Sequence, residues 1–316
     1  MITWGGESGA TAVESFLKEA GFTVSERCCA RPSCFDFVAR KNGRVLFIKI
    51  LPDIGNLSLK DSRELKGISE FFSAAPILVG EETRENPLED DTVYSRYDIS
   101  AFTLKTFANM VVHKAYPLIQ ASPGGYYVEI DGETIRKRRQ ELGLSIGDTA
   151  KLIGISRRTV YGYERGMAKA SVTAAYNIIS KLGVPVARPL NIFENAKQQR
   201  KCCLLTSARR MMSKKAILQR IFNKFARYRI TTVKKAPFDF VFNVPDDKAR
   251  IMGGVANENE PQLKRRVDEI LSVSKIVQAH PVLITEGQEP PNTDITCIDS
   301  GDFLRTRNPE NLIAKA

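Results

Sequence analysis

Hydrophobic and polar positions in residues 1–120 follow a pattern that predicts an α/β domain. Val13, Leu17 and Ala20 recur at helical spacing and predict a helix from Ser8 to Ala20. Residues 45–51 are almost continuously apolar and predict a buried strand. The other predicted elements are strands at 23–28 and 34–39, a turn at 41–43, a helix at 60–72, a strand at 76–79, a further strand starting at 93–94 and a helix at 99–110.

The same order of elements returns after residue 212. The motif FDFV at 35–38 recurs at 238–241, 203 residues later, and AAPILV at 74–79 corresponds to AHPVLI at 279–284, 205 residues later. Two matches in the same order on the same predicted elements indicate an internal duplication. The predicted elements are a helix at 213–228, strands at 230–233 and 238–241, a turn at 245–247, a strand at 250–255, a helix at 263–277, a strand at 281–284 and a helix start at 302–304.

Between these regions, the pattern from Gly132 to Leu182 predicts four short amphipathic helices. The second and third are joined by a tight turn in which Gly154 supplies the bend and Ile155 is expected to enter the core. Ser156 is a good N-cap for the next helix, which we call the recognition helix (residues 156–164). Ala150 is small where two helices must approach each other closely.

These residues resemble the Cro/cI repressor type of helix-turn-helix domain. The resemblance implies a DNA partner, with the recognition helix in the major groove. Members of that family often carry glutamine at the start of the second helix, where it steadies a phosphate contact, whereas this chain has Ile146 and Gly147 there. The matching residues are IRKRRQELGLS at 135–145, Ala150, the Gly-Ile-Ser of 154–156, Thr159-Val160, ERG at 164–166 and LGV at 182–184.

The expected docking of this helix assigns the candidate DNA contacts. Arg157 and Arg158 are the strongest base-reading candidates, because a guanidinium donates two hydrogen bonds to guanine. Glu164 is expected to pair with an arginine of the first helix, since DNA phosphates repel acidic groups. The remaining candidates are Thr159 and Tyr161 for bases, and Arg136, Ser145, Thr149 and Lys169 for phosphates.

Positive charge is concentrated in one part of the chain. The 316 residues carry a net charge of +11, but residues 191–235 alone hold 13 basic side chains against Glu194. Residues 121–190 add a net +5, whereas residues 1–120 and 236–316 are slightly acidic. This distribution indicates a polyanion-binding zone, with a solvated basic surface as the alternative for 191–235. The basic linker candidates are Lys197, Arg200, Lys201, Arg209, Arg210, Lys214 and Lys215.

The predicted α/β regions resemble the restriction-endonuclease-like fold and its resolvase relatives. In active members an Asp and a Glu hold the metal that activates water, and a Lys stabilises charge on the phosphate. The resemblance places Asp36 and Lys49 at two of these positions, but Phe47 stands where the Glu belongs. In the second region Asp239 is retained, and Gly253 and Val255 are expected opposite Phe47 and Lys49. One carboxylate per copy cannot build the usual site, so we expect no bound metal and no hydrolysis.

The predicted architecture is an α/β and all-α multidomain chain, in which two similar restriction-endonuclease-like domains flank a four- to five-helix Cro/cI-type domain. The expected boundaries are 1–120, a linker at 121–131, the helix-turn-helix domain at 132–190, the basic linker at 191–212 and the second α/β domain at 213–316. This layout resembles a family of archaeal helix-turn-helix transcriptional regulators.

The resemblance implies a sequence-specific DNA-binding regulator of double-stranded DNA. We expect it to act as a cytoplasmic homodimer with no cofactor, and an effector or the transcription machinery remains a possible further partner. A nuclease targeted by the helix-turn-helix and a DNA-organising structural protein are the alternatives. The six cysteines contain no CxxC pair, which argues against zinc and leaves buried thiols or a redox sensor at 28–29 or 202–203.

Overall fold

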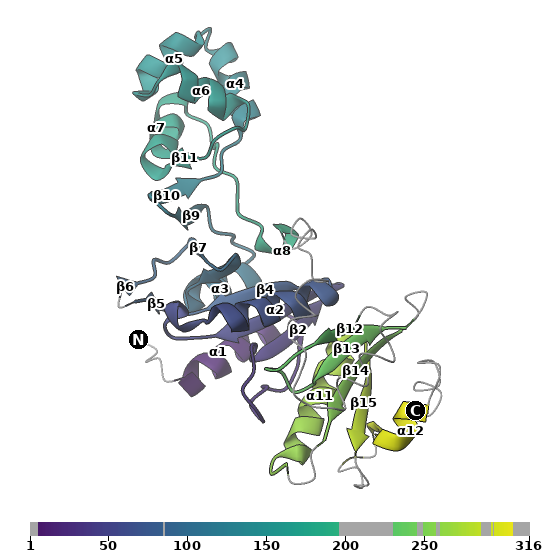
Figure 1. The fold of residues 1–316 in the computed structure, drawn as a ribbon. Helices are drawn as coiled ribbons and strands as arrows, with labels where there is room; N and C mark the ends of the chain where they lie inside the picture. The colour runs from purple at the N-terminus through teal and green to yellow at the C-terminus, as the bar shows by residue number, and fades with distance from the viewer. Residues whose placement is uncertain are drawn as a thin grey trace. The chain divides into compact units, whose positions relative to one another are not determined.

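The computed structural model describes residues 6–84, 86–195, 230–244, 249–256, 260–285, 292 and 294–305. Its contacts divide the chain into two compact units (Figure 1). The first unit comprises residues 1–51, 56–78 and 193–316, and the second comprises residues 52–55 and 79–192. The N-terminal and C-terminal α/β regions therefore share one unit, and the helix-turn-helix region lies in the other.

The N-terminal region of the first unit has the predicted order of a helix, antiparallel strands, a helix and a strand. Strands β2 and β3 are joined by the predicted turn, where Asn42 and Gly43 have positive φ angles of 49° and 74°. Their register pairs Phe37 with Ile48 and Val38 with Phe47, which places the aromatic positions in the core. The elements are α1 (Gly6–Glu19), β1 (Thr23–Val24), β2 (Phe37–Lys41), β3 (Arg44–Ile50), α2 (Leu59–Phe71) and β4 (Ala75–Val79).

The C-terminal region repeats this arrangement. β12, β13 and β14 are antiparallel, and β15 and β16 continue the sheet in parallel. Its core includes Phe240, Phe242, Ile251 and Ile284. The predicted helix at 213–228 and turn at 245–247 lie outside the described residues. The elements are β12 (Ile230–Thr232), β13 (Phe240–Asn243), β14 (Arg250–Val255), α11 (Leu263–Val277), β15 (His280–Thr285), β16 (Thr296–Asp299) and α12 (Ser300–Arg305).

Within the first unit, the two α/β regions exchange the same contact in both directions. The Glu64 carboxylate of α2 accepts the backbone N–H groups of Lys234 and Lys235 at 3.0 and 2.8 Å. The Glu269 carboxylate of α11 accepts those of Cys29 and Ala30 at 2.8 and 2.7 Å. Each of these residues has its counterpart 205 positions away. Reciprocal contacts of this kind are those of two subunits related by a twofold axis.

An aromatic pair, with one ring from each α/β region, lies in the contact between the two regions. The rings of Phe35 and Phe238, which are the first residues of the two FDFV motifs, have centroids 6.2 Å apart. Both side chains are fully buried. Burial also raises the pKa of the Glu269 carboxyl, while the two N–H groups that it accepts act in the opposite direction. The contact between the regions is therefore part of a continuous core.

The second unit begins with strands that differ from two predictions. Residues 99–110, predicted as one helix, form strand β8 (Ile99–Phe102) and helix α3 (Leu104–Val111), because the Thr103 hydroxyl caps a new helix by accepting the N–H of Thr106. The predicted linker 121–131 contains most of a hairpin, β9 (Ile119–Ser122) and β10 (Gly125–Val128), which turns at Gly124. The other elements are η1 (Ile54–Asn56), β5 (Glu82–Thr83), β6 (Asn86–Pro87) and β7 (Thr92–Arg96), which pairs with β8 and β9.

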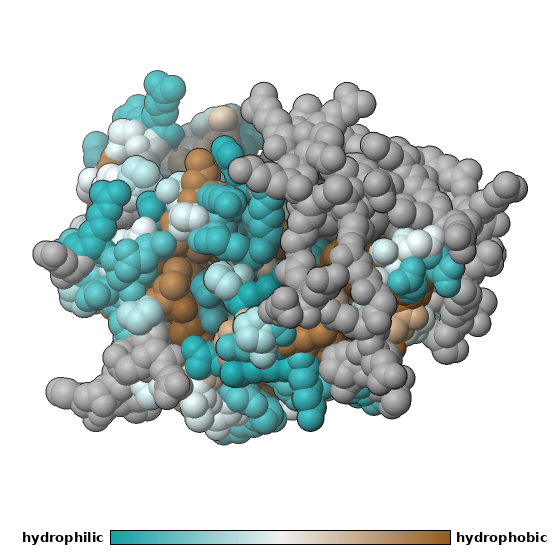
Figure 2. Space-filling view, turned by 60° about the horizontal axis from the view of Figure 1, so that its bottom comes forward, coloured by the Kyte–Doolittle hydropathy of each residue, from teal (hydrophilic) through white to brown (hydrophobic). Residues whose placement is uncertain are grey.

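The helix-turn-helix module is built on this hairpin. Its four main helices are α4 (Gly132–Glu141), α5 (Ile146–Ile153), α6 (Arg157–Glu164) and α7 (Val172–Leu182), and short α8 (Ile192–Asn195) follows. Strand β11 (Ala170–Ser171) pairs with β10 and ties the module to the hairpin (Figure 1). Ile135, Ile153, Tyr163 and Ile178 share one hydrophobic core. The face of the molecule in Figure 2 mixes hydrophilic and hydrophobic side chains.

Candidate nucleic-acid interface

The turn between α5 and α6 has the predicted parts. Gly154 adopts a left-handed conformation with φ of 84°, and both its N–H and that of Ile155 donate to the Ala150 carbonyl. Ser156 caps α6 by accepting the N–H of Thr159 at 3.0 Å. Ala150 is 4% exposed, which permits the close approach of the helices. These local predictions are confirmed.

Helix α6 has one buried and one exposed face. Val160 and Tyr163 are 1% and 6% exposed and anchor the helix in the module. Arg158, Tyr161 and Arg165 are exposed on the opposite side. The Arg165 guanidinium lies 5.3 Å from the centroid of the Tyr161 ring, a cation–π contact that links the two side chains. Arg165, the C-cap residue of α6, is not among the predicted contacts, although its spacing of four residues from Tyr161 places both on the same side of the helix.

Helix α6 is held against α4 by the ion pair predicted for Glu164. The Glu164 carboxylate accepts two hydrogen bonds from the Arg139 guanidinium at 2.6 and 3.1 Å, and Arg139 also donates to the Leu144 carbonyl. The bonds to Glu164 raise the pKa of Arg139. Gly132 at the start of α4 meets the backbone of Tyr163 so closely that a Cβ would clash with its carbonyl oxygen. These contacts fix the orientation of α6.

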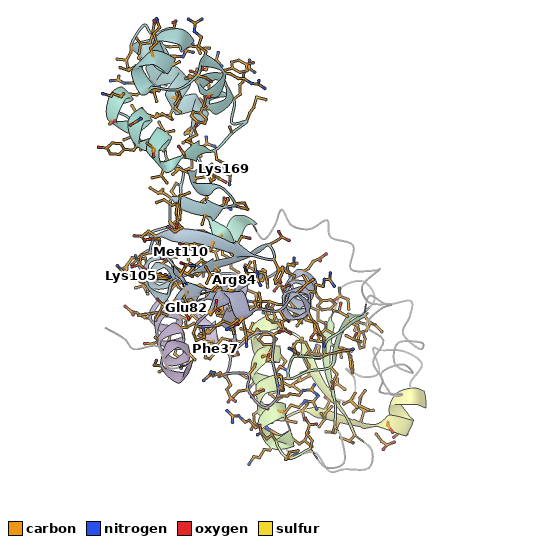
Figure 3. All side chains as sticks on the ribbon, turned by 60° about the vertical axis from the view of Figure 1, so that its left-hand side comes forward. Phe37, Glu82, Arg84, Lys105, Met110 and Lys169 are labelled. Atoms are coloured by element: carbon orange, nitrogen blue, oxygen red, sulfur yellow. The ribbon has the colours of Figure 1, made fainter. Side chains whose placement is uncertain are left out.

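The four predicted phosphate contacts differ in their availability. Arg136 is exposed on α4. Ser145 is exposed, but its hydroxyl and N–H form a capping box with Asp148 at the start of α5. Lys169 pairs with Glu129 at 2.9 Å and lies beside the β9–β10 hairpin (Figure 3). Arg136 and Ser145 therefore remain predictions, and Lys169 requires its ion pair to open.

Thr149 is a correction to the predicted contacts. Its side chain is fully buried, and its hydroxyl donates to the Ser145 carbonyl at 2.9 Å. A buried hydroxyl that bonds the preceding turn of its own helix has no access to a phosphate. The basic linker residues, from Lys197 to Lys215, lie outside the described residues.

Arg157 occupies a special position at the start of α6. Its guanidinium lies over Gly147 of α5: a Cβ added at Gly147 would be 3.0 Å from Arg157 Nε and 3.2 Å from Cζ. Arg157 is itself exposed. The departure from the usual helix-turn-helix sequence at Ile146-Gly147 is thus matched by a guanidinium that covers the glycine.

The first α/β region places Asp36 and Lys49 together, as the nuclease resemblance predicts. The Asp36 carboxylate accepts the Ile50 N–H at 2.7 Å and lies 3.3 Å from the Lys49 ammonium, which also donates to the Ser33 carbonyl at 3.0 Å. Phe47 is fully buried and stacks on Phe72 with ring centroids 5.9 Å apart. One carboxylate, already paired, does not fit a divalent cation, which requires several oxygen ligands.

In the second α/β region, two arginines contact the carboxylate that corresponds to Asp36. The Asp239 carboxylate accepts the Val255 N–H at 2.7 Å and contacts Arg266 at 2.6 Å and Arg31 at 2.9 Å. Arg266 has no exposed surface and also pairs with Glu260 at 2.7 Å. Neither Arg31 nor Arg266 was predicted from the sequence to lie at this position. Among the described residues, no group of three or more His, Cys, Asp or Glu side chains is placed to hold a metal.

The backbone hydrogen bonds correct the predicted alignment of the two regions. Asp36 N–H donates to Ile48 O, and Asp239 N–H donates to Gly253 O. Phe47 and Lys49 therefore correspond to Met252 and Gly254, one position earlier than the predicted Gly253 and Val255. The distance in sequence from the Asp to these positions is two residues longer in the second region than in the first, whereas the predicted alignment implied a difference of three residues. A Cβ at Gly254 would be 3.2 Å from Arg266 Nη2, so the missing side chain makes room for the arginine.

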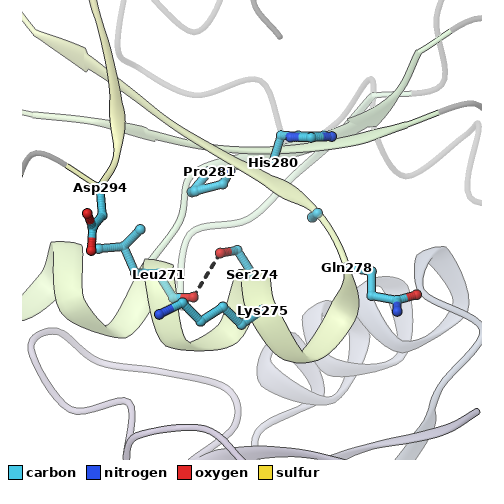
Figure 4. Close-up of a pocket in the computed structure, with 8 residues that line it drawn as sticks. Leu271, Ser274, Lys275, Gln278, His280, Pro281 and Asp294 are labelled. Carbon is cyan, nitrogen blue, oxygen red and sulfur yellow. Dashed lines mark hydrogen bonds between the residues drawn. The ribbon is translucent and has the colours of Figure 1, made fainter. Parts of the chain in front are cut away.

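The buried cysteines and a hollow beside α11 are weaker candidates for a functional site than the DNA-binding module. Burial raises the pKa of Cys28 and of Cys34 well above the ordinary value, which disfavours the thiolate needed for redox chemistry. A hollow at the C-terminal end of α11 is lined by Ser274, Lys275 and His280, among others (Figure 4). The Ser274 hydroxyl in this hollow donates a hydrogen bond to the Leu271 carbonyl of its own helix.

Two domain families match the chain. The PD-(D/E)XK superfamily domain matches residues 7–117, which include Asp36 and Lys49. A helix-turn-helix family matches residues 135–188, which include all of α5 and α6. The fold and the two matches define a DNA-binding protein that joins a helix-turn-helix to a restriction-endonuclease-like α/β domain. Among the described residues, no helix is long and apolar enough to cross a membrane.

Archaeal relatives match along most of the chain. The relative from Methanocella arvoryzae is 33% identical over 281 residues, 88% of this chain and 85% of its own. Those from Archaeoglobus fulgidus and Pyrococcus furiosus are 32% and 31% identical over 87% and 88% of this chain, and 85% and 86% of their own. Each is named "Putative HTH-type transcriptional regulatory protein". The chain belongs to this archaeal family of helix-turn-helix transcriptional regulators. No solved structure matches it.

Proposed function

We propose that this protein is a sequence-specific DNA-binding transcriptional regulator that acts as a homodimer. The observation that carries the proposal is the exposed face of α6, where Arg158, Tyr161 and Arg165 stand opposite the buried Val160 and Tyr163. Arginine and tyrosine side chains on one side of a helix suit contacts with base edges and phosphates in the major groove. The names of the relatives support the same conclusion.

The homodimer follows from the length of sequence that one module can read. One recognition helix contacts only a few base pairs, and two half-sites one helical turn apart supply the specificity that a genome requires. The test is selection of bound duplexes from a random library with the full chain, followed by the stoichiometry of the complex. We expect a motif with twofold symmetry that binds two chains. A motif without symmetry that binds one chain would contradict the homodimer.

We further propose that the two α/β regions are degenerate copies of one restriction-endonuclease-like domain and do not hydrolyse DNA. Their matching strand order and equivalent Asp36 and Asp239 hydrogen bonds support the duplication. The buried Phe47 and the Asp36–Lys49 pair support the loss of chemistry. In this proposal the paired regions serve as a scaffold for the DNA-binding module.

The superfamily match makes a targeted nuclease the competing function, which leads to a direct prediction. The full chain with Mg²⁺ or Mn²⁺ is expected to leave plasmid and branched DNA uncut, because among the described residues no cluster of carboxylates is placed to hold a metal and Asp36 is paired with Lys49. Gel assays over long incubations, with a known metal-dependent nuclease as positive control, measure this. Metal-dependent cutting that Asp36→Ala abolishes would establish the nuclease instead.

A further inference from the structure

Two neighbouring arginines at the start of α6 lie in different surroundings. The Arg157 guanidinium covers Gly147, with Nη2 at 3.2 Å from the place of a Cβ. The Arg158 side chain is exposed. Because successive residues of an α-helix are turned by about 100°, the two side chains leave α6 in different directions. Arg158 projects away from the side of Val160 and Tyr163, and Arg157 lies at the edge that faces α5.

Gly147 makes this placement possible. Glycine within a helix is unfavourable relative to alanine, because it loses more conformational freedom on folding. It nevertheless lies in the first turn of α5, an element with no other glycine between Ile146 and Ile153. A Cβ at 3.0 Å from Arg157 Nε is closer than ordinary van der Waals contact, so the guanidinium would have to shift by a few tenths of an ångström away from α5. The glycine and the arginine are thus one structural feature.

The Arg157 guanidinium is available to a ligand. Asp148, the residue after Gly147, has its carboxylate engaged by the hydroxyl and N–H of Ser145. These bonds are the main cause of the lowered pKa of Asp148, with Lys151 and Arg157 contributing less. Among the described residues, Arg157 forms no hydrogen bond or ion pair. Its planar donors lie over Gly147 and have no hydrogen-bond partner among the described residues, an arrangement that suits a phosphate group.

We propose that Arg157 is a positioning residue that contacts a DNA phosphate, and that Gly147 holds it there, while base reading falls to Arg158 and its neighbours on the exposed face of α6. This inference rests on the proposed function, and it assigns the phosphate contact and the base contacts to different residues of α6. A phosphate contact fixes the register of the helix on the duplex without carrying sequence information.

The experiment measures the affinity of the full chain for its selected duplex and for an unrelated duplex of equal length, across a series of salt concentrations. Arg157→Ala is expected to weaken both by the same factor and to reduce the salt slope by about 0.9, the value for one lost phosphate contact. Gly147→Ala is expected to act in the same direction while leaving thermal stability equal or higher. The double variant is expected to match Arg157→Ala alone.

Arg157→Lys separates the two roles further, because a lysine ammonium binds phosphate as a point charge but does not reproduce a bidentate contact with guanine. It is expected to restore most of the salt slope. A loss confined to the selected duplex, or an unchanged slope in Gly147→Ala, would overturn the proposal and leave the regulator function intact. If the wild-type chain binds all duplexes equally, the proposed function as a sequence-specific regulator is wrong. The change in salt slope still tests whether Arg157 contacts a phosphate.

Discussion

Replacement of Arg266 by Leu is expected to lower the free energy of unfolding of the first unit by about 3 to 5 kcal/mol. Arg266 is fully buried and donates to Asp239, Glu260 and the Pro237 carbonyl, at 2.6 to 2.7 Å. A leucine removes all of these donors and leaves Arg31 as the remaining charged partner of the buried Asp239 carboxylate among the residues that the structure describes. Removing one member of a buried ion pair costs more than the pair contributes, because the remaining charge stays out of water.

The measurement is urea unfolding of the full chain followed by circular dichroism, with hydrogen exchange to locate the change in α11 and β13 to β15. Lys264→Leu is the matched control, since Lys264 is exposed on the same helix and its loss should change stability by less than about 0.5 kcal/mol. Equal free energies of unfolding for Arg266→Leu and Lys264→Leu would show that Arg266 does not stabilise the buried Asp239 carboxylate.

The second large effect is expected at the recognition helix. Arg158→Ala should weaken binding to the selected duplex by about 1 to 3 kcal/mol and change binding to an unrelated duplex much less, because a base contact is made only on the preferred sequence. Fluorescence anisotropy at constant salt measures both affinities. Lys181→Ala, which removes an exposed cation from α7, serves as the control. An equal loss on both duplexes would assign Arg158 to the phosphates.

The helix-turn-helix was predictable because its determinants are local. Gly154 sets the turn, Ser156 caps the helix that follows, and Glu164 reaches Arg139 as expected from the repulsion between acidic groups and DNA. The signals at Gly154 and Ser156 act within about one helical turn, whereas Glu164 and Arg139 are 25 residues apart and their pairing was expected from charge, not from proximity in the sequence. The turn at Asn42-Gly43 is also set locally. Local chemistry of this kind can be recognised without knowledge of tertiary packing.

The errors arose where distant or competing contacts decide the structure. Residues 99–110 were predicted as one helix because they are largely apolar, but Thr103 caps a separate helix after a strand. Thr149 was assigned to a phosphate from the expected docking of the module, yet its side chain on α5 is buried. Neither the apolar pattern nor the resemblance distinguishes these cases, since burial depends on the elements that pack around them.

The arginines at Asp239 could not be predicted for a further reason. Arg31 and Arg266 reach this carboxylate from 208 and 27 residues away in the chain, and no motif links them. The relevant feature of the sequence is Gly254. It occupies the position that corresponds to Lys49 and leaves the space that Arg266 fills. Recognising it requires the correct register, which the two-residue difference between the copies obscured.

Recognition of particular DNA sequences through α6 can be tested by a map of the binding sites of this protein along the chromosome in the cells that produce it. Crosslinking and sequencing of bound DNA, for the wild-type chain and for Arg158→Ala, provides that map. We predict a small set of sites near promoters that share one motif of twofold symmetry and are lost in Arg158→Ala. Even coverage of the chromosome, unchanged in the variant, would contradict the claim and indicate a protein that organises DNA.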